Sequence, residues 1–597
     1  MISLLRNNNV SSAASPKLRS IDNLEKCLGV IFAILVLIFL VSLFKNISYP
    51  LLWADESMTV MHGKRILEYG YPKVHDGKNV VYDLRHPNKK LGIDEKTDAY
   101  IGGANWGMYY VAAIAVYFAE MSHDIYTKTA IVRIPFALVG LAGLALLALL
   151  TTQFFNSSAS KKGFLVLFIF LELISIPLVL HLREARYYSL TVFLTALVVI
   201  IYTRYSILKN IGYRAYAVLL TVSLFLLFLT FSPVYFIFLV AIFLYESILA
   251  VKFFLLEYLV NRRSVSPVAR ISAINSFKHY FKNMLSLMLS LVAVTPLIFF
   301  FKTFYIADEM AKYNYYLFGT SKWEMYLENL RVIWKYFASL DFIYLAIFLK
   351  GCLLLSSIWL SRRNISSPNV QKFKYSSFLT IIFIVYFFTI AKIPNYPFTR
   401  YFIPLQPLLA LIIILDLVLV YNVINIHQSF NIKYFKAAFI ILFAGFIFTN
   451  ISRNMEYFSG HIYELSHQYK GPLDHLIPFI KENYEDTDKL IIATNYEETS
   501  FMYYLDSKVI IGYVGYNLEK DLEIVPDIVV YRKGWKNFPK IFISFLEKNT
   551  YERISFPVYD YKVNNIPDLI MPFEFKHQFY TLYTQDELNK VAIYLKR

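Results

Sequence analysis

The stretch Trp53-Ala54-Asp55-Glu56-Ser57 follows an apolar run at 28–46, and together these two features decide the fold class. The run reaches the ~17 to 25 residues that cross a bilayer and has no small-residue cleavage site, so we expect an uncleaved first membrane helix. Two adjacent carboxylates then stand just beyond its end, where charge is costly unless it serves a function. Asp55 and Glu56 therefore either solvate a helix end or take part in chemistry.

The whole chain is too apolar for a soluble protein. Of its 597 residues, 57% are hydrophobic and 17% are charged, with a mean hydropathy of +0.47. One core cannot hide that much apolar surface, so the composition predicts a polytopic α-helical membrane protein. About eleven apolar runs have spanning length, at 28–46, 131–151, 163–181, 188–203, 215–231, 234–252, 284–301, 342–360, 376–391, 401–421 and 435–451.

A further apolar run at 106–118 decides the topology. It is shorter than a crossing requires, so we interpret it as an amphipathic helix on the outer face. Leaving it out of the spans places the basic loops on the same side as the basic N-terminus, as the positive-inside rule demands. We therefore expect a multi-pass protein of the cytoplasmic (inner) membrane, with its N-terminus inside and a large first loop, 48–130, outside.

The composition changes near residue 454, which predicts a membrane domain at 1–453 and an extracytoplasmic α/β domain at 454–597. In the second part a helix-like run at 472–483 precedes a strand-like run at 489–494, and similar alternation continues to 548. This part carries a net charge of −5 against +16 for the whole chain, so the positive excess belongs to the membrane part. Short basic clusters between apolar runs indicate loops at an anionic membrane surface, and nucleic acid is not an expected partner. The second domain either covers or contacts the acceptor, or is a structural cap.

Basic residues in outer loops run against the topological bias, and the turn His181-Leu-Arg-Glu-Ala-Arg-Tyr-Tyr188 is the clearest case. Arg183 and Arg186 are three residues apart, so we expect them on one helical face with Glu184 turned away. Two guanidinium groups on one face could bind a phosphate in a bidentate manner. The alternative is that they reach lipid head groups or pair with Glu184.

A second outer turn is bracketed by Lys392 and Arg400. These two cations could complete the same anion-binding site, although each could also be an interface anchor. Asp55, Glu56 and Glu184 could hold a divalent cation, because hard cations need only carboxylate and water ligands. No cofactor is otherwise indicated.

Other ionisable residues favour no further site. The histidines of the first loop lack the spacing of a zinc site: they are His62, His75 and His86. The carboxylates in or near the predicted spans would suit the proton relay of a transporter, but they are scattered and we expect no basic partner within the membrane: they are Glu172, Glu246 and Asp416.

Taken in order, several short motifs resemble the GT-C superfamily of membrane glycosyltransferases that use polyprenyl-phosphate sugars, such as protein O-mannosyltransferases and aminoarabinose transferases. The motifs are Trp53-Ala-Asp-Glu56, the helix near 105–110, Arg133-Ile-Pro135, Arg183-Glu-Ala-Arg-Tyr-Tyr-Ser189 and Thr399-Arg-Tyr-Phe-Ile-Pro404. The resemblance covers the membrane half, and the C-terminal part is similar to the appended outer domain of some members.

The resemblance implies an inverting enzyme whose donor is a polyprenyl-phosphate sugar and whose acceptor is a hydroxyl of a lipid, glycan or protein. Asp55 would act as general base or bind the acceptor, supported by Glu56, while Arg183, Arg186 and Arg400 would hold the donor phosphate. The competing hypothesis is a transporter or flippase for a lipid-linked glycan. That class would show repeated halves with broken helices at matching positions, and the sequence has no such repeat.

Overall fold

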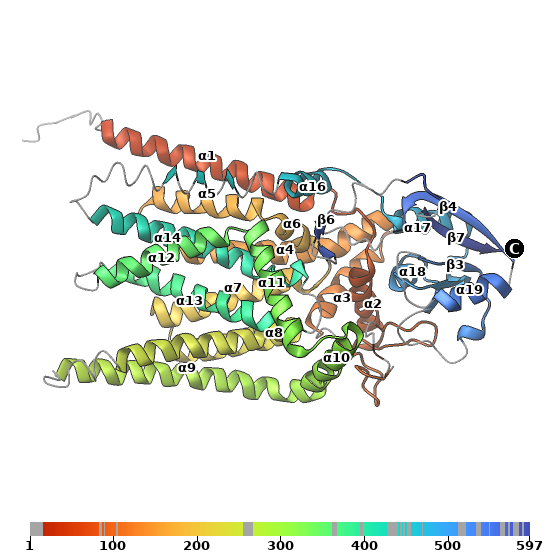
Figure 1. Ribbon diagram of the computed structural model, residues 1–597, viewed down its shortest axis with the longest axis horizontal. Helices are drawn as coiled ribbons and strands as arrows, with labels where there is room; N and C mark the ends of the chain where they lie inside the picture. The colour runs from red at the N-terminus through yellow and green to blue at the C-terminus, as the bar shows by residue number, and fades with distance from the viewer. Residues whose placement is uncertain are drawn as a thin grey trace, which may run out of the picture.

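The computed structural model describes the chain in several segments. They are residues 16–82, 86, 88, 90–102, 106–254, 267–360, 367–393, 398–426, 440–441, 444–445, 448–449, 455–468, 470–511, 521–532, 539–548, 550–560, 568–570, 574–576, 584–587 and 590–597. A long bundle of helices carries a small α/β region at one end, here called the domain end (Figure 1).

The bundle is built from apolar helices that run along its length, with further helices at the domain end. The helices that run along the bundle are α1 (Pro16–Phe44), α4 (Ile125–Thr152), α5 (Ser158–Ile174), α7 (Tyr187–Tyr202), α8 (Tyr213–Phe254), α9 (Pro267–Phe300), α12 (Ile343–Leu360), α13 (Ser367–Ile390) and α14 (Leu405–Ile426). The other helices are α2 (Ala54–Tyr69), α3 (Gly107–Ala119), α6 (Ile176–Arg183), α10 (Thr303–Phe318), α11 (Lys322–Leu340), α16 (Met455–Ser466) and the 3₁₀ turn η3 (Thr399–Phe402).

Seven helices of the described residues are long and apolar enough to cross a membrane, or nine if each of two sharply bent pairs, α5 with α6 and α11 with α12, is one span. The chain is thus a polytopic α-helical membrane protein. Helix α8 contains two of the eleven expected spans, 215–231 and 234–252, divided at Phe231, whose φ of −150° and ψ of 92° are not helical. The expected span 435–451 lies largely outside the described residues.

The two halves of α8 run in opposite directions, because both of its ends meet the same end of α7. Tyr205, just after α7, stacks on Tyr216 with ring centroids 4.0 Å apart, and Tyr202 donates a hydrogen bond to Glu246. The other end of α7 reaches the division in α8, where Tyr187 stacks on Phe231 at 4.5 Å. The predicted pair of spans is therefore a helical hairpin.

Helix α3 is the short helix expected at 106–118, and it lies at the domain end beside α2 (Figure 1). The two helices lie so close together that a Cβ atom added at Gly63 would be only 2.8 Å from the backbone nitrogen of Ala113. The expectation that α3 is amphipathic is wrong, since its exposed side also carries large apolar groups, including Ile114 and Phe118. Such a surface suits lipid better than water.

The bundle interior corrects a further expectation, that intramembrane carboxylates lack a basic partner. Lys350 of α12 pairs with buried Asp416 of α14 at 2.8 Å, and Ser376 of α13 lies 2.5 Å from the same carboxylate. The ion pair therefore joins three helices inside the bundle. Charges within a bilayer persist when they are paired in this way.

The C-terminal region contains a five-stranded sheet of order β2-β1-β3-β7-β4. Strand β1 runs parallel to β2 and β3, whereas β7 is antiparallel to β3 and β4, so the sheet is mixed. A two-stranded antiparallel sheet is separate from this one, and its first strand, β5, contacts η3 of the bundle. The elements are α17 (Pro472–Asn483), β1 (Ile491–Thr494), α18 (Glu498–Leu505), β2 (Lys508–Ile511), β3 (Ile528–Val530), α19 (Pro539–Lys548), β4 (Tyr551–Tyr559), β5 (Asp568–Ile570), β6 (Glu574–Lys576) and β7 (Lys590–Lys596).

This region docks on the first loop through polar contacts. The side-chain amide of Asn79 donates to the Ser507 carbonyl at 2.8 Å and accepts from the Val509 amide at 2.7 Å. It thus bonds the backbone of β2 as a neighbouring strand would. Asp474 of α17 accepts hydrogen bonds from the amides of Leu51 at 3.2 Å and Gly471 at 2.9 Å. The α/β region thus packs against the first loop, including the segment that leads into α2.

Docking at Asp474 is expected to depend on pH. Burial raises the pKa of this carboxyl from 3.8 to about 7, outweighing the hydrogen bonds from Gly471 and Leu51 that lower it. Because the folded state holds the proton more tightly than the unfolded state, stability is full below pH 4 and is lost as the pH rises through about 7. The melting temperature of purified protein should fall between pH 5.5 and 8.5, and by less in Asp474→Asn. An equal fall in both proteins would contradict this assignment.

Candidate functional site

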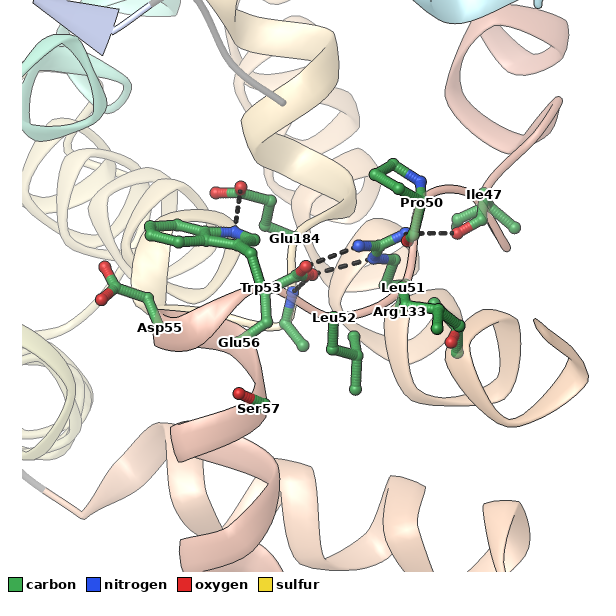
Figure 2. Close-up of polar contacts among 12 residues, drawn as sticks. Ile47, Pro50, Leu51, Leu52, Trp53, Asp55, Glu56, Ser57, Arg133 and Glu184 are labelled. Carbon is green, nitrogen blue, oxygen red and sulfur yellow. Dashed lines mark hydrogen bonds and ion pairs between the residues drawn. The ribbon is translucent and has the colours of Figure 1, made fainter. Parts of the chain in front are cut away.

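Asp55 and Glu56 lie in the first turn of α2, where the helix dipole favours negative charge. Trp53 precedes the helix in an extended conformation, and α2 ends at Tyr69. Gly70 follows with a φ of 82°, and its amide donates a hydrogen bond to the Ile66 carbonyl. The two carboxylates point in different directions (Figure 2). Asp55 is one-fifth exposed, whereas Glu56 is fully buried.

Two arginines from distant segments converge on the Asp55 carboxylate. Oδ2 of Asp55 lies 3.5 Å from Nη2 of Arg186 and 3.6 Å from Nη2 of Arg400. These separations are longer than an ordinary hydrogen bond, so the three groups face one another across a small gap. The arrangement brings one carboxylate and two fixed cations to a single point at the domain end.

Each arginine is held by contacts other than the one with the Asp55 carboxylate. Nη1 of Arg186 donates to the Asp55 carbonyl and to the Thr59 hydroxyl, both at 3.0 Å. The guanidinium of Arg400 lies over the rings of Phe398 and Trp53, with its central carbon 4.1 Å and 5.5 Å from their centroids. Stacking of this kind fixes the guanidinium plane without consuming its hydrogen-bond donors.

Glu56 is the partner of Arg133 of α4 (Figure 2). Its Oε1 accepts from Nε of Arg133 at 2.8 Å and from the Ala185 amide at 2.9 Å, while its Oε2 accepts from Nη2 at 2.5 Å. Nη1 of Arg133 donates to the carbonyls of Ile47 and Pro50, both at 2.9 Å. This buried pair ties α2 to α4, to the chain leaving α1, and to the turn that carries Arg186.

Glu184 lies on the other side of Trp53 from Asp55 (Figure 2). Its carboxyl accepts a hydrogen bond from the Trp53 indole at 2.9 Å and lies 3.2 Å from Nδ1 of His181. Burial, followed by the nearby charge of Glu56, raises the pKa of Glu184 well above its ordinary value. Glu184 thus orients the indole that stacks on Arg400.

The expectation that Arg183 and Arg186 share a helical face is wrong. Helix α6 ends at Arg183 and α7 begins at Tyr187, and Glu184 and Arg186 between them have extended backbone. Arg183 instead donates to the Lys45 carbonyl at 3.2 Å. Lys392 is exposed just after α13, and among the described residues the ion pairs of Asp55 are with Arg186 and Arg400 alone.

The carboxylates expected to hold a divalent cation do not converge. Asp55 faces the two arginines, both oxygens of Glu56 are taken by hydrogen bonds, and Glu184 is bonded to Trp53. Across the described ranges, no group of three or more histidine, cysteine, aspartate or glutamate residues could hold a metal ion. The residues present do not fit a cation at this point.

The histidines of the first loop are also separate. Buried His62 stacks on Tyr100 and packs at a tilt against Tyr109, with each ring centroid 4.6 Å away. Burial, and then the charge of Arg65, lowers the pKa of His62 to about 3, so the imidazole is neutral. It belongs to the packing beneath the site.

Three contributors to this site have weak signals in the sequence, or none. Arg133 belongs to one of the motifs of the resemblance, and a lone arginine in an apolar helix indicates a buried partner. Thr59 lies one helical turn after Asp55, which is the spacing for a shared face. The stacking role of Trp53 had no sequence signal beyond its position beside the carboxylates.

The fold and the site together define a polytopic membrane protein with a compact cluster of charges where the bundle meets its α/β region. No family model matches the chain, and a search of curated proteins found no match. Among solved structures, the chain is similar to the oligosaccharyltransferase of Archaeoglobus fulgidus, crystallised in complex with Zn and sulfate, with 14% identity and a TM-score of 0.44. The similarity covers 80% of this chain and 61% of that protein.

Proposed function

We propose that the chain is a membrane glycosyltransferase of the GT-C type, which moves a sugar from a polyprenyl-phosphate donor to a hydroxyl of a lipid, glycan or protein acceptor. The observation that carries this proposal is the placement of Asp55 opposite Arg186 and Arg400 at 3.5 and 3.6 Å. A sugar phosphodiester needs both a base for the incoming alcohol and cations for the departing phosphate, and this cluster holds both.

In the proposed reaction, Asp55 takes the proton of the acceptor hydroxyl as its oxygen attacks the anomeric carbon. The bond between that carbon and the phosphate oxygen breaks, and the electron pair leaves with the polyprenyl phosphate. Arg186 and Arg400 stabilise the negative charge that develops on this phosphate. A single displacement inverts the anomeric carbon, and a positioned base contributes typically about 10²- to 10⁴-fold.

Glu56 takes a different part in this proposal. Both of its oxygens already accept hydrogen bonds from Arg133 and the Ala185 amide, so it has little capacity left to act as a base. Because Ala185 precedes Arg186, the buried pair positions the Asp55 helix and the Arg186 turn with respect to each other. We therefore propose Glu56 as a positioning residue.

Basic residues from two of the loops expected inside lie at the end of the bundle away from the α/β region. Lys162 lies near Glu25 of α1, and Lys209 lies near His279 of α9. By the positive-inside rule, we propose that this end faces the cytoplasm. Sugar transfer would then occur at the outer face of the cytoplasmic membrane, where a lipid-linked donor needs no nucleotide.

The test of this function is label transfer. Purified protein is incubated with radiolabelled polyprenyl-phosphate sugars and membrane extract, and lipid, glycan and protein fractions are assayed for label. A labelled acceptor with release of polyprenyl phosphate supports a transferase. Movement of intact lipid-linked sugar across reconstituted vesicles, without a new glycosidic bond, would instead support the flippase hypothesis.

Donor binding should depend on Arg186 and Arg400. Replacing either arginine with alanine removes a charge-assisted hydrogen bond worth about 1.5–3 kcal/mol, so the donor Kd should rise about 10- to 150-fold. Titration of the polyprenyl-phosphate sugar against purified protein measures this change. Arg331→Ala, which alters an exposed arginine of α11, is the matched control and should leave the Kd unchanged.

Arg183→Ala tests whether Arg183 binds the donor as Arg186 is proposed to do. The sequence alone predicts weaker donor binding for this variant, whereas the contact of Arg183 with the Lys45 carbonyl predicts a smaller effect than Arg186→Ala. An unchanged Kd in both Arg186→Ala and Arg400→Ala would remove the phosphate-binding role from this cluster.

A further inference from the structure

Helix α18 of the α/β region lies against α2, on the side away from the bundle (Figure 1). Oγ of Ser57 lies 2.7 Å from Oγ1 of Thr499, and Oγ of Ser500 lies 2.8 Å from the Leu52 carbonyl. The Leu52 amide donates to the Tyr504 hydroxyl at 3.1 Å. Three hydroxyls from one helix therefore bond the Leu52 backbone before Asp55 and the Ser57 side chain after it.

These contacts are buried, so water does not compete for them. Residues 499–505 are all buried, and Ser57 and Ser500 have no exposed surface. The Tyr504 hydroxyl also lies 2.5 Å from the Thr129 hydroxyl of α4, which links α18 to the bundle. Buried hydroxyl networks that are fully bonded restrict a segment to one conformation.

Helix α18 is itself held firmly at its start. Glu497, the residue before the helix, is buried and pairs with Arg532, which also bonds Asp560 at 2.5 Å. The Arg532 amide and carbonyl are both bonded to the side chain of Asn495, at 2.8 and 3.0 Å. These buried contacts fix the position of α18, and therefore of the hydroxyls that it carries.

We propose that α18 is a positioning element for sugar transfer, in which Thr499, Ser500 and Tyr504 hold residues 52–57 so that Asp55 meets the acceptor hydroxyl. This role rests on the function proposed above. It differs from a covering or acceptor-contacting role, because α18 acts through the backbone of the Asp55 segment. Misplacing a reacting group by about 1 Å can cost about 10²-fold in rate.

The test uses the full-length protein and near-isosteric changes. Tyr504→Phe and Thr499→Val each remove one hydroxyl, and the double variant should lower kcat about 10- to 100-fold while the donor Kd stays unchanged. Thr499→Ser keeps a hydroxyl and should restore the rate lost in Thr499→Val. Thr487→Val, which removes the hydroxyl bond to the Leu505 carbonyl in the same region, is the matched control with a kcat near wild type.

Hydrogen exchange gives a readout that is independent of activity. Tyr504→Phe should speed exchange at the Leu52 amide, whose acceptor it removes, whereas Thr487→Val should not. Faster exchange with unchanged kcat in the double variant overturns the positioning role and leaves the proposed function intact. A wild-type protein that transfers no label to any acceptor overturns the proposed function, and the positioning role with it.

Discussion

Replacing Asp55 with asparagine should abolish sugar transfer while leaving donor binding intact. Asparagine preserves the size of the side chain but cannot take a proton from the acceptor, so the rate should fall by at least the ~10²- to 10⁴-fold of a positioned base. The carboxylate also stands between Arg186 and Arg400, where it competes electrostatically with a phosphate. Removing its charge should therefore maintain or tighten the donor Kd.

The measurement pairs two assays on one preparation. Transfer of radiolabel to acceptor gives the rate, and titration of the donor gives the Kd. Glu120→Gln is the matched control, because Glu120 is a half-exposed carboxylate that pairs with Lys128 at the same end of the bundle. Full activity in Asp55→Asn would remove the central residue from the proposal, and loss of donor binding would reassign Asp55 to the donor site.

The elements that could be predicted from the sequence are those that local pattern controls. Spans such as 28–46 and 131–151 stand out because their length and hydropathy match the thickness of a bilayer. Helix α17 has the predicted bounds of 472–483, since its apolar residues recur at helical spacing. The run at 106–118 is too short to cross a bilayer, which correctly predicts a short helix, but its exposed side is apolar and not polar as expected.

The sequence indicates a turn between two spans at 181–188 but not its conformation, because a long-range contact overrides local preference there. Arginine, glutamate and alanine all favour helix, so the local sequence predicts that Arg183 and Arg186 share one helical face. The chain opens instead where the Ala185 amide bonds to Glu56, 129 residues away, and where Glu184 accepts from Trp53, 131 residues away. Intrinsic propensity is a weak signal when buried charged groups compete for backbone donors.

The same reasoning applies to the two carboxylates at the centre of the site. Asp55 and Glu56 are adjacent, and the resemblance implies that Glu56 supports Asp55 in catalysis, yet the helix turns their side chains to different surroundings. Glu56 meets Arg133, 77 residues away, while Asp55 meets arginines from two other segments. No pattern in a single sequence distinguishes them, because the distinction arises from where α4 and α7 pack.

This division of roles predicts that Glu56→Ala damages the fold itself. The Arg133 guanidinium is 3% exposed and would lose its charged partner, and removing one member of a buried pair typically costs about 3–5 kcal/mol. The carbonyls of Ile47 and Pro50 would remain bonded to a cation that nothing neutralises. We expect a marked fall in the melting temperature in detergent, together with loss of transfer.

The control for this prediction is Glu328→Ala, which breaks an exposed pair with Arg331 and should barely change the melting temperature. Arg133→Ala should be as damaging as Glu56→Ala, and the double variant less damaging than the sum of the two, because the single variants each leave one charge unpaired. Asp55→Asn should lose transfer at an unchanged melting temperature. If Glu56→Ala also kept its melting temperature and lost only transfer, Glu56 would be a reacting group and its proposed positioning role would be wrong.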